Sequence, residues 1–244
     1  MSIIRIFHAS DLHFGAEDRA ALDWFAAQVQ SDGPDAIIIT GDITMRARHS
    51  EFAAAANWIT SLNTPVTVEI GNHDMPYFNP IERFANPYRR YRAMANMVER
   101  AIDLPGLAIV PLHTTAPAQW RFNWSKGVVK AKSLATTVAA IAKLPVSHMT
   151  LVAAHHPLVE TGTRGTALTR GGTRALDALT KAGVTAVLSG HVHDAFDLMH
   201  HGTHGNIRMI GAGTLSERLR TTRPSYNELV ITGGNLAVAA HLMP

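Results

Sequence analysis

Five short apolar runs divide this chain, and each one ends just before a fragment rich in Asp, Asn, His or Gly. The runs are nearly continuous in their apolar character and contain many β-branched residues. Runs of this length and composition predict β-strands that are buried on both faces of a sheet. The predicted strands are Ile3–Phe7, Ala36–Ile39, Val66–Ile70, Met149–Ala154 and Val184–Leu188.

Helix-like stretches separate these predicted strands. Strands that alternate with helices predict an α/β architecture built from crossover units. The length of 244 residues fits one large domain, so we expect a single domain over residues 1–244. The predicted helices are Asp18–Gln30, Ser50–Ser61, Lys132–Lys143 and Gly172–Ala182.

Two regions depart from this alternation. After Gly190, short strand-like runs are joined by Gly- and Asn-rich turns, and we expect them to be antiparallel and to close a second sheet. Between residues 76 and 130, prolines interrupt the pattern, and we expect loops and one basic helix that form a lid over the strand ends. The late strand-like runs are Asp194–His200, Ile207–Ile210, Glu228–Ile231 and Leu236–His241.

The absence of Cys excludes disulfides and thiolate metal ligands. A bound metal would therefore be held by His, Asp, Glu, Asn or main-chain oxygens. The chain does not begin with a basic stretch followed by an apolar one, and it has no run of about 18 apolar residues that would span a membrane. We therefore expect a cytoplasmic protein without a membrane span, and the sequence leaves its oligomeric state open.

Basic residues are concentrated in one part of the chain. Between Met75 and Lys132 there are nine Lys or Arg residues and three acidic residues, a balance of +6, whereas the whole chain carries +3. The overall charge is too small to indicate a dedicated nucleic-acid-binding protein. A nucleic-acid substrate is therefore possible but not favoured.

The polar fragments that follow the predicted strands carry the chemistry of this sequence. In open α/β sheets, ligands bind at the carboxyl ends of the strands, so we expect these fragments to meet at one site. Hard oxygen ligands together with imidazoles suit manganese, iron or zinc, and the set is larger than one tetrahedral zinc requires. The sequence therefore predicts a site for two divalent metals. The fragments are Asp11-Leu-His13, Gly41-Asp42, Gly71-Asn72-His73-Asp74, His155-His156-Pro157 and Gly190-His191-Val192-His193.

Each fragment alone has an ordinary structural explanation. Asp11 and Asp42 are suited to cap helices, and His73 is suited to a loop in which its ring is hydrogen-bonded. Gly-Asp and Gly-Asn pairs usually form turns. No ordinary structural explanation covers all five fragments at the ends of five apolar runs.

The complete set of fragments resembles the calcineurin-like metallophosphoesterases, and the resemblance spans Asp11 to His193. The His-His-Pro step is similar to the bacterial branch that includes cyclic-nucleotide and glycerophosphodiester phosphodiesterases. The resemblance implies a four-layer α/β/β/α sandwich of two mixed sheets flanked by helices, with a dinuclear metal site at the strand ends. It implies that one metal is held by Asp11, His13, Asp42 and His193, and the other by Asp42, Asn72, His155 and His191.

The resemblance also implies a mechanism. A hydroxide that bridges two divalent metals would attack a phosphate ester, most favourably a diester. His73 would lie beside the substrate, where it stabilises charge or protonates the leaving group, and Asp74 would orient it through a hydrogen bond. We choose His155 over His156 as the ligand because the family ligand lies two residues before the proline.

Three further residues are candidates for substrate binding. His156 is about equally suited to hold substrate and to pack against its neighbours. Arg89 and Arg92 lie on one side of a predicted amphipathic helix, where they either face solvent or bind an anionic substrate.

Three function classes remain open. The favoured one is hydrolysis of a small phosphate ester. The basic segment, together with Trp120 and Trp124, would also suit a nuclease or a pyrophosphatase of nucleotide-sugar lipids. A non-catalytic scaffold of the same fold is disfavoured, because every ligand position is filled.

Overall fold

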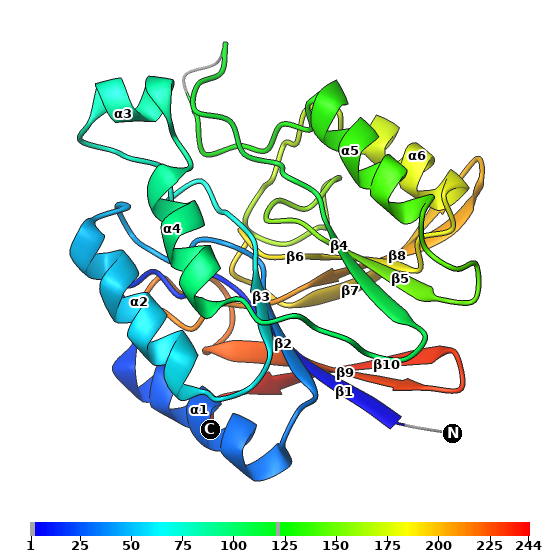
Figure 1. The fold of residues 1–244 in the computed structure, drawn as a ribbon, viewed down its shortest axis with the longest axis horizontal. Coiled ribbons are helices and arrows are strands. Elements are labelled where there is room, and N and C mark those ends of the chain that lie inside the picture. The colour runs from blue at the N-terminus through cyan, green and yellow to red at the C-terminus, as the bar shows by residue number, and fades with distance from the viewer. Residues whose placement is uncertain (1–2, 121–122) are drawn as a thin grey trace.

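Two five-stranded sheets face each other and are covered on their outer sides by helices (Figure 1). The structure is a computed structural model that describes residues 3–120 and 123–244 of the 244-residue chain. None of the helices in these described ranges is both long enough and apolar enough to cross a membrane.

The first sheet has the strand order β10-β9-β1-β2-β3. The strands β1, β2 and β3 are parallel, whereas β9 is antiparallel to β1 and forms a hairpin with β10. The strands are β1 (Ile3–Ala9), β2 (Ala36–Ile39), β3 (Val66–Val68), β9 (Ser225–Thr232) and β10 (Asn235–Leu242).

The second sheet has the strand order β4-β5-β6-β8-β7. Its first four strands are parallel, and only β7, at one edge, runs antiparallel to its neighbour β8. The strands are β4 (Leu107–Pro111), β5 (Met149–Ala153), β6 (Ala186–Ser189), β7 (Phe196–Gly202) and β8 (Gly205–Gly211).

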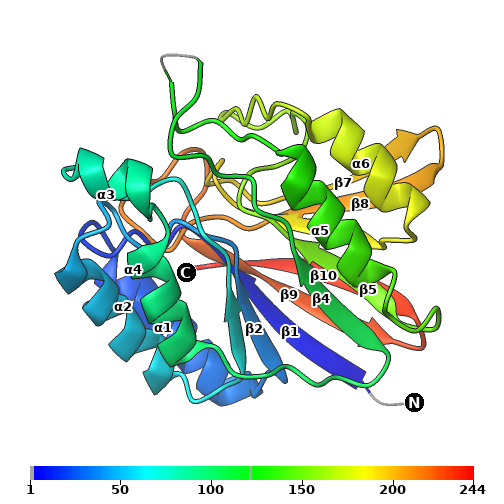
Figure 2. The ribbon, with the colours of Figure 1, turned by 45° about the horizontal axis from the view of Figure 1, so that its top comes forward.

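Helices cover the outer face of each sheet. The views in Figures 1 and 2 both place α1, α2 and α4 on the side of the first sheet and α5 and α6 on the side of the second. Asp18 caps the start of α1 by accepting a hydrogen bond from the main-chain N–H of Ala21 at 3.1 Å. The helices are α1 (Arg19–Asp32), α2 (His49–Ser61), α3 (Pro80–Ala85), α4 (Arg89–Val98), α5 (Ala131–Ile141) and α6 (Gly172–Lys181).

The four layers enclose three apolar cores, and alternate residues of one strand enter different cores. In β2, Ile37 and Ile39 pack toward the helices, whereas Ala36 and Ile38 pack toward the second sheet. In β5, Val152 lies in the core beneath α5 and α6. Because both faces of these strands are buried, their sequences are continuously apolar. The predicted four-layer α/β/β/α sandwich of two mixed sheets is therefore confirmed.

Three details differ from the sequence-based expectation. The strands β9 and β10 extend the first sheet and do not close the second. The strand β8 is parallel to β6. It occupies an interior position because Ile207 and Met209 are apolar and buried, while the more polar β7 takes the exposed edge. The segment 76–130 contains two helices, α3 and α4, and also contributes β4 to the second sheet.

Candidate metal centre

The polar fragments meet at one edge of the two sheets, as their positions after β1, β2, β5 and β6 require. Each of four overlapping sets of side chains has ligand atoms that lie within 4.8 Å of one another. The sets are Asp11 with His13 and His193, Asp11 with Asp42 and His155, His13 with Asp42 and His73, and His155 with His156 and His191. Fragments that are distant in the sequence therefore form one cluster.

Five residues of this cluster have a left-handed backbone, which residues other than Gly rarely adopt. Their φ angles lie between 46° and 69°. Such a conformation is unfavourable and persists only where the surrounding structure enforces it, and it is concentrated at functional sites. These residues are Asp11, His13, Asp42, His191 and His193.

Glycines allow the loops to approach one another at two points. A Cβ atom at Gly71 would collide with the main chain and carboxylate of Asp42, and one at Gly190 would collide with the Ser10 hydroxyl and approach Asp11. Both glycines are thus required by close packing around two carboxylates of the cluster.

The first ligand group consists of Asp11, His13 and His193. His193 donates from Nδ1 to the carbonyl oxygen of Arg218 at 2.5 Å, so its Nε2 faces Asp11 Oδ1, which is 3.1 Å away. The Nε2 atoms of His13 and His193 are 3.3 Å apart. Two ring nitrogens this close must have a proton or a metal cation between them.

The electrostatics of this group favour a cation. Burial by itself would raise the pKa of Asp11, but the neighbouring His193 outweighs burial and holds that pKa below its usual range. At His193, burial would lower the pKa, and the contact with Asp11 outweighs it and raises the pKa. Burial lowers the pKa of His13 to about 3, so this imidazole is held neutral, as a metal ligand must be.

The second ligand group consists of Asn72, His155 and His191, and it contains no carboxylate of its own. His155 donates from Nδ1 to the Thr40 carbonyl at 2.8 Å, which leaves its Nε2 facing the cluster. One end of the Asn72 amide lies 3.2 Å from His155 Nε2, His191 Nδ1 and the Ser125 carbonyl oxygen. An amide nitrogen would donate to these atoms, whereas a cation among them would select the amide oxygen.

Asp42 connects the two ligand groups. Its Oδ1 accepts a hydrogen bond from the His73 main chain at 2.8 Å. Its Oδ2 lies 3.4 Å from His155 Nε2 and 3.8 Å from His13 Nε2. Burial would lower the pKa of His155, but Asp42 outweighs it and raises that pKa to about 9. This buried carboxylate is therefore positioned to be shared by two cations, and the donor set of the cluster fits them.

Comparison with known proteins agrees with this geometry. A family model described as calcineurin-like phosphoesterase matches residues 4–195. The chain belongs to the calcineurin-like phosphoesterase family. It is 28% identical over 170 residues to a probable cyclic nucleotide phosphodiesterase from Rhodococcus erythropolis, a match that covers 66% of this chain and 52% of that protein. The chain thus spans about half the length of that curated relative.

Solved structures of two phosphatases share the fold of this phosphoesterase. A dimetal phosphatase from Danio rerio aligns with a TM-score of 0.69 and 12% identity over 97% of this chain and 95% of its own. The purple acid phosphatase of yellow lupin (Lupinus luteus) seeds aligns with a TM-score of 0.71 and 14% identity over 99% and 52%. At these identities the likeness establishes the fold alone.

The two residues that we assigned to catalysis have different surroundings in this phosphoesterase. His73 is half-buried, and its ring lies edge-to-face against His13 with 4.8 Å between the ring centroids. Asp74 is fully buried and accepts hydrogen bonds from the main chain of Ile43, Thr44 and Gly71. His73 Nδ1 lies 2.7 Å from the Met45 carbonyl oxygen, so a carbonyl and not Asp74 orients the ring.

His156 lies beside the second ligand group, and both of its ring nitrogens are hydrogen-bonded. Nε2 donates to the Ser125 carbonyl at 2.7 Å, and Nδ1 lies 2.9 Å from the Thr114 hydroxyl. These contacts fasten the segment around Ser125 to the end of β5, and they occupy the atoms with which His156 would bind a substrate.

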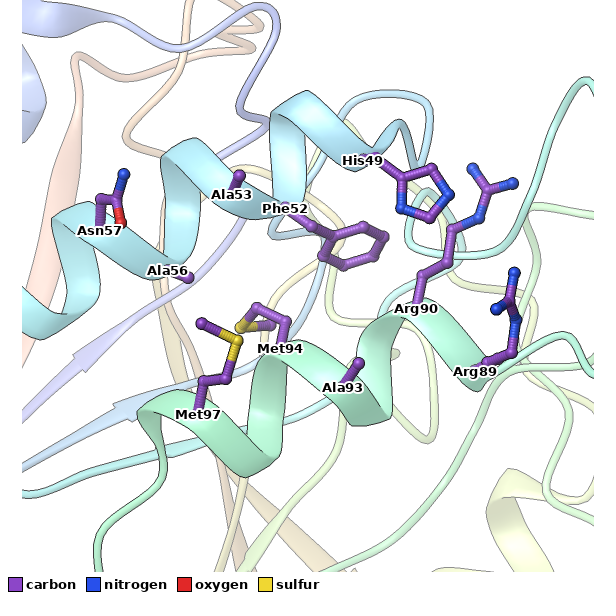
Figure 3. A pocket seen from close by; sticks show the side chains of 10 residues that line it. All are labelled: His49, Phe52, Ala53, Ala56, Asn57, Arg89, Arg90, Ala93, Met94 and Met97. Atoms are coloured by element: carbon purple, nitrogen blue, oxygen red, sulfur yellow. The ribbon is translucent and has the colours of Figure 1, made fainter.

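Arg89 and Arg92 lie on α4, outside the cluster. Arg89 binds Glu82 through Nε and Nη2, at 3.0 and 2.8 Å, and stands at the end of a groove of about 260 Å³ between α2 and α4 (Figure 3). Figure 3 shows apolar side chains, among them Phe52 and Met94, between these helices. Arg92 stacks over the Tyr88 ring at 5.6 Å. Substrate binding by either arginine stays a prediction.

One residue near the cluster was not anticipated from the sequence. Arg218, in the loop between β8 and β9, reaches His73 with its Nη1 atom, 3.0 Å from His73 Nε2. The rule that active residues follow the carboxyl ends of parallel strands applies to this loop, because β8 is parallel to β6. We did not apply this rule to Arg218, because we expected the strand that precedes it to be antiparallel.

Proposed function

We propose that this chain is a metal-dependent phosphohydrolase, and within that class a phosphodiesterase that acts on a small phosphate ester. The observation that carries the proposal is the position of Asp42 Oδ2, which lies 3.4 Å from His155 in one ligand group and 3.8 Å from His13 in the other. A buried carboxylate between two sets of donors suits a pair of cations held close together. The similarity to a probable cyclic nucleotide phosphodiesterase supports a diester substrate.

The residues of the chain supply position and orientation. When bound, two divalent cations (manganese, iron or zinc) would withdraw charge from a phosphate group and lower the pKa of a water molecule. The Thr40 and Arg218 carbonyls hold His155 and His193 by Nδ1, so that each Nε2 faces the cluster. His73 stands beside His13 of the first ligand group and the shared Asp42, and it is our candidate for the residue that acts on the substrate.

Hydrolysis of bis-p-nitrophenyl phosphate tests this proposal. The protein is stripped of metal and then supplied separately with Mn²⁺, Fe²⁺ or Zn²⁺, and p-nitrophenyl phosphate serves as the monoester for comparison. We expect metal-dependent hydrolysis with preference for the diester. His73→Ala should retain both metals while turnover falls roughly 10²- to 10⁴-fold. Absence of hydrolysis with all three metals would refute the proposal that this chain is a phosphohydrolase.

A nuclease is the second candidate, because aromatic residues of the segment 76–130 are exposed. Trp120 is 98% exposed, and the Arg83 guanidinium lies 5.5 Å from the ring centroid of Trp124. Exposed aromatic rings beside arginine suit the stacking of bases. Turnover of single-stranded DNA that falls steeply with salt would favour the nuclease, since each phosphate contact adds to the salt dependence.

A further inference from the structure

The loop between β8 and β9, residues 212–224, is fastened to the metal centre from both sides. Thr214 donates from its hydroxyl to the Asp11 carbonyl at 2.7 Å. Asp194 accepts hydrogen bonds from the main chain and the hydroxyl of Thr221, at 3.0 and 3.2 Å. The backbone of Arg218, which lies between these anchors, is therefore fixed relative to the ligand groups.

Arg218 makes two separate contacts with the centre. Its carbonyl oxygen orients His193, as described above. Its guanidinium Nη1 lies 3.0 Å from His73 Nε2 and 3.4 Å from the sulfur of Met45. Because His73 Nδ1 donates to the Met45 carbonyl at 2.7 Å, Nε2 carries the lone pair and accepts from Arg218. The hydrogen bonds therefore place a fixed positive charge beside the ligand groups.

Among the residues that the structure describes, the positive charge of Arg218 has no acidic partner. Within residues 3–120 and 123–244, no carboxylate oxygen lies within 4.0 Å of its guanidinium nitrogens, and its hydrogen bonds go only to His73 and Met45, both from Nη1. Its Nη2 and Nε donors are thus available on a half-buried side chain. By contrast, Arg89 and Arg90 are both paired with Glu82.

We propose that Arg218 binds the phosphate group of the substrate, a role that rests on the phosphohydrolase function proposed above. The planar guanidinium fork matches two oxygens of a phosphate group. His73 holds the fork in place through Nε2, and because its Nδ1 is bound to the Met45 carbonyl, His73 acts on the substrate through Arg218. The phosphate would thereby lie between the ligand groups and Arg218.

The affinity of the Mn²⁺-loaded protein for inorganic phosphate tests this role, measured by isothermal titration calorimetry. Arg218→Met removes the charge but keeps the main-chain carbonyl that orients His193. We expect phosphate affinity to fall roughly tenfold to a hundredfold, the usual effect of removing a charged hydrogen bond, with metal content unchanged. Arg218→Lys should restore part of the affinity, since lysine keeps the charge but not the fork. The matched control is Arg220→Met, an exposed arginine of the same loop, which should bind phosphate like the wild type.

Combination with His73→Ala separates phosphate binding from support of His73. Arg218→Met should weaken phosphate affinity further in the His73→Ala background. Unchanged affinity in Arg218→Met, no additional loss in the double variant, or loss of metal from Arg218→Met would each overturn the proposal. Failure of the phosphohydrolase function itself is distinguishable, because then the wild type would hydrolyse no ester and its phosphate binding would not depend on metal.

Discussion

The two ligand groups of the proposed metal centre differ in charge. The first group contains the carboxylate of Asp11, whereas the second, Asn72 with His155 and His191, contains only neutral donor types. Both share Asp42, which lies between them. Because carboxylates attract a divalent cation more strongly than neutral donors do, the first group should bind its cation more tightly, and the second should depend more on Asp42.

Their surroundings differ as well. The first group is held by the loop 212–224, through the Thr214 hydroxyl and the Arg218 carbonyl. The second group faces Ser125, whose carbonyl is fastened by His156 and belongs to the segment 76–130. The first group thus lies against the loop 212–224, and the second lies against the segment 76–130, although both groups follow the ends of strands. We therefore expect changes in the loop 212–224 to affect mainly the first group, and changes around Ser125 to affect mainly the second.

The largest effect is expected from Asp42→Asn, which removes the carboxylate that both groups share. An Asn oxygen can still accept the His73 N–H bond, so the loop should keep its shape. We expect both cations to be lost at micromolar metal and turnover to fall at least about a thousandfold, measured by elemental analysis and ester hydrolysis. Asp197→Asn, which alters a surface carboxylate paired with Arg208, serves as the control. If Asp42→Asn retains two cations, Asp42 is not a ligand that both cations require.

Asp11→Asn should weaken cation binding in the first group and leave the second group intact. It removes the one carboxylate that belongs to the first group alone, while an Asn oxygen can replace Oδ2 as the acceptor of the His191 N–H. We expect one cation per chain to remain and turnover to fall by about two orders of magnitude. Asn72→Ala is the counterpart in the second group, and elemental analysis of both variants should again find one cation. A variant that loses both cations would show that the groups do not bind independently.

Asn72→Asp tests whether charge accounts for the difference between the groups. A carboxylate here should strengthen binding of the second cation by roughly tenfold and bring the two metal dissociation constants together. Calorimetric titration of the metal-free protein measures both constants. If the second constant does not change, geometry and not charge distinguishes the groups.

The smallest effect at neutral pH is expected from a histidine outside the centre. His8 is fully buried in β1, hydrogen-bonded to the Thr40 hydroxyl at 3.0 Å, and burial lowers its pKa to about 3. The folded chain therefore keeps His8 neutral, whereas the unfolded chain binds a proton below about pH 6.5. This contribution to the free energy of unfolding is complete above pH 6.5 and falls by about 1.4 kcal/mol per pH unit between about 6.5 and about 3.

Denaturant unfolding of the metal-free protein at several pH values measures this dependence. In His8→Gln, the free energy of unfolding should depend less steeply on pH, by the equivalent of about one proton. Metal binding at neutral pH should be unchanged. If the free energy of unfolding depends on pH equally in the variant and the wild type, His8 does not remain neutral in the folded chain.

Much of the architecture could be predicted from periodicity. The strand Ala36–Ile39 was predicted with its observed bounds, and the helix over Ser50–Ser61 begins one residue earlier, at His49. These elements are strongly patterned because their faces are buried in separate cores. The strand β4 was missed, since it is only partly buried and lies among prolines, and the partners of β9 and β10 were misassigned, since pairing depends on contacts that are distant in the sequence.

Residue types and their places after apolar runs were enough to predict the chemistry of the site, because they limit which ligands can meet. Tertiary structure alone decided which atoms face one another. The left-handed backbone of Asp11 and His193, the carbonyl that orients His73, and the approach of Arg218 all arise from loops that are packed together in space. The physical reason is that hydrogen bonds across loops depend on the direction of the strands that carry them, and the strand pattern does not encode direction.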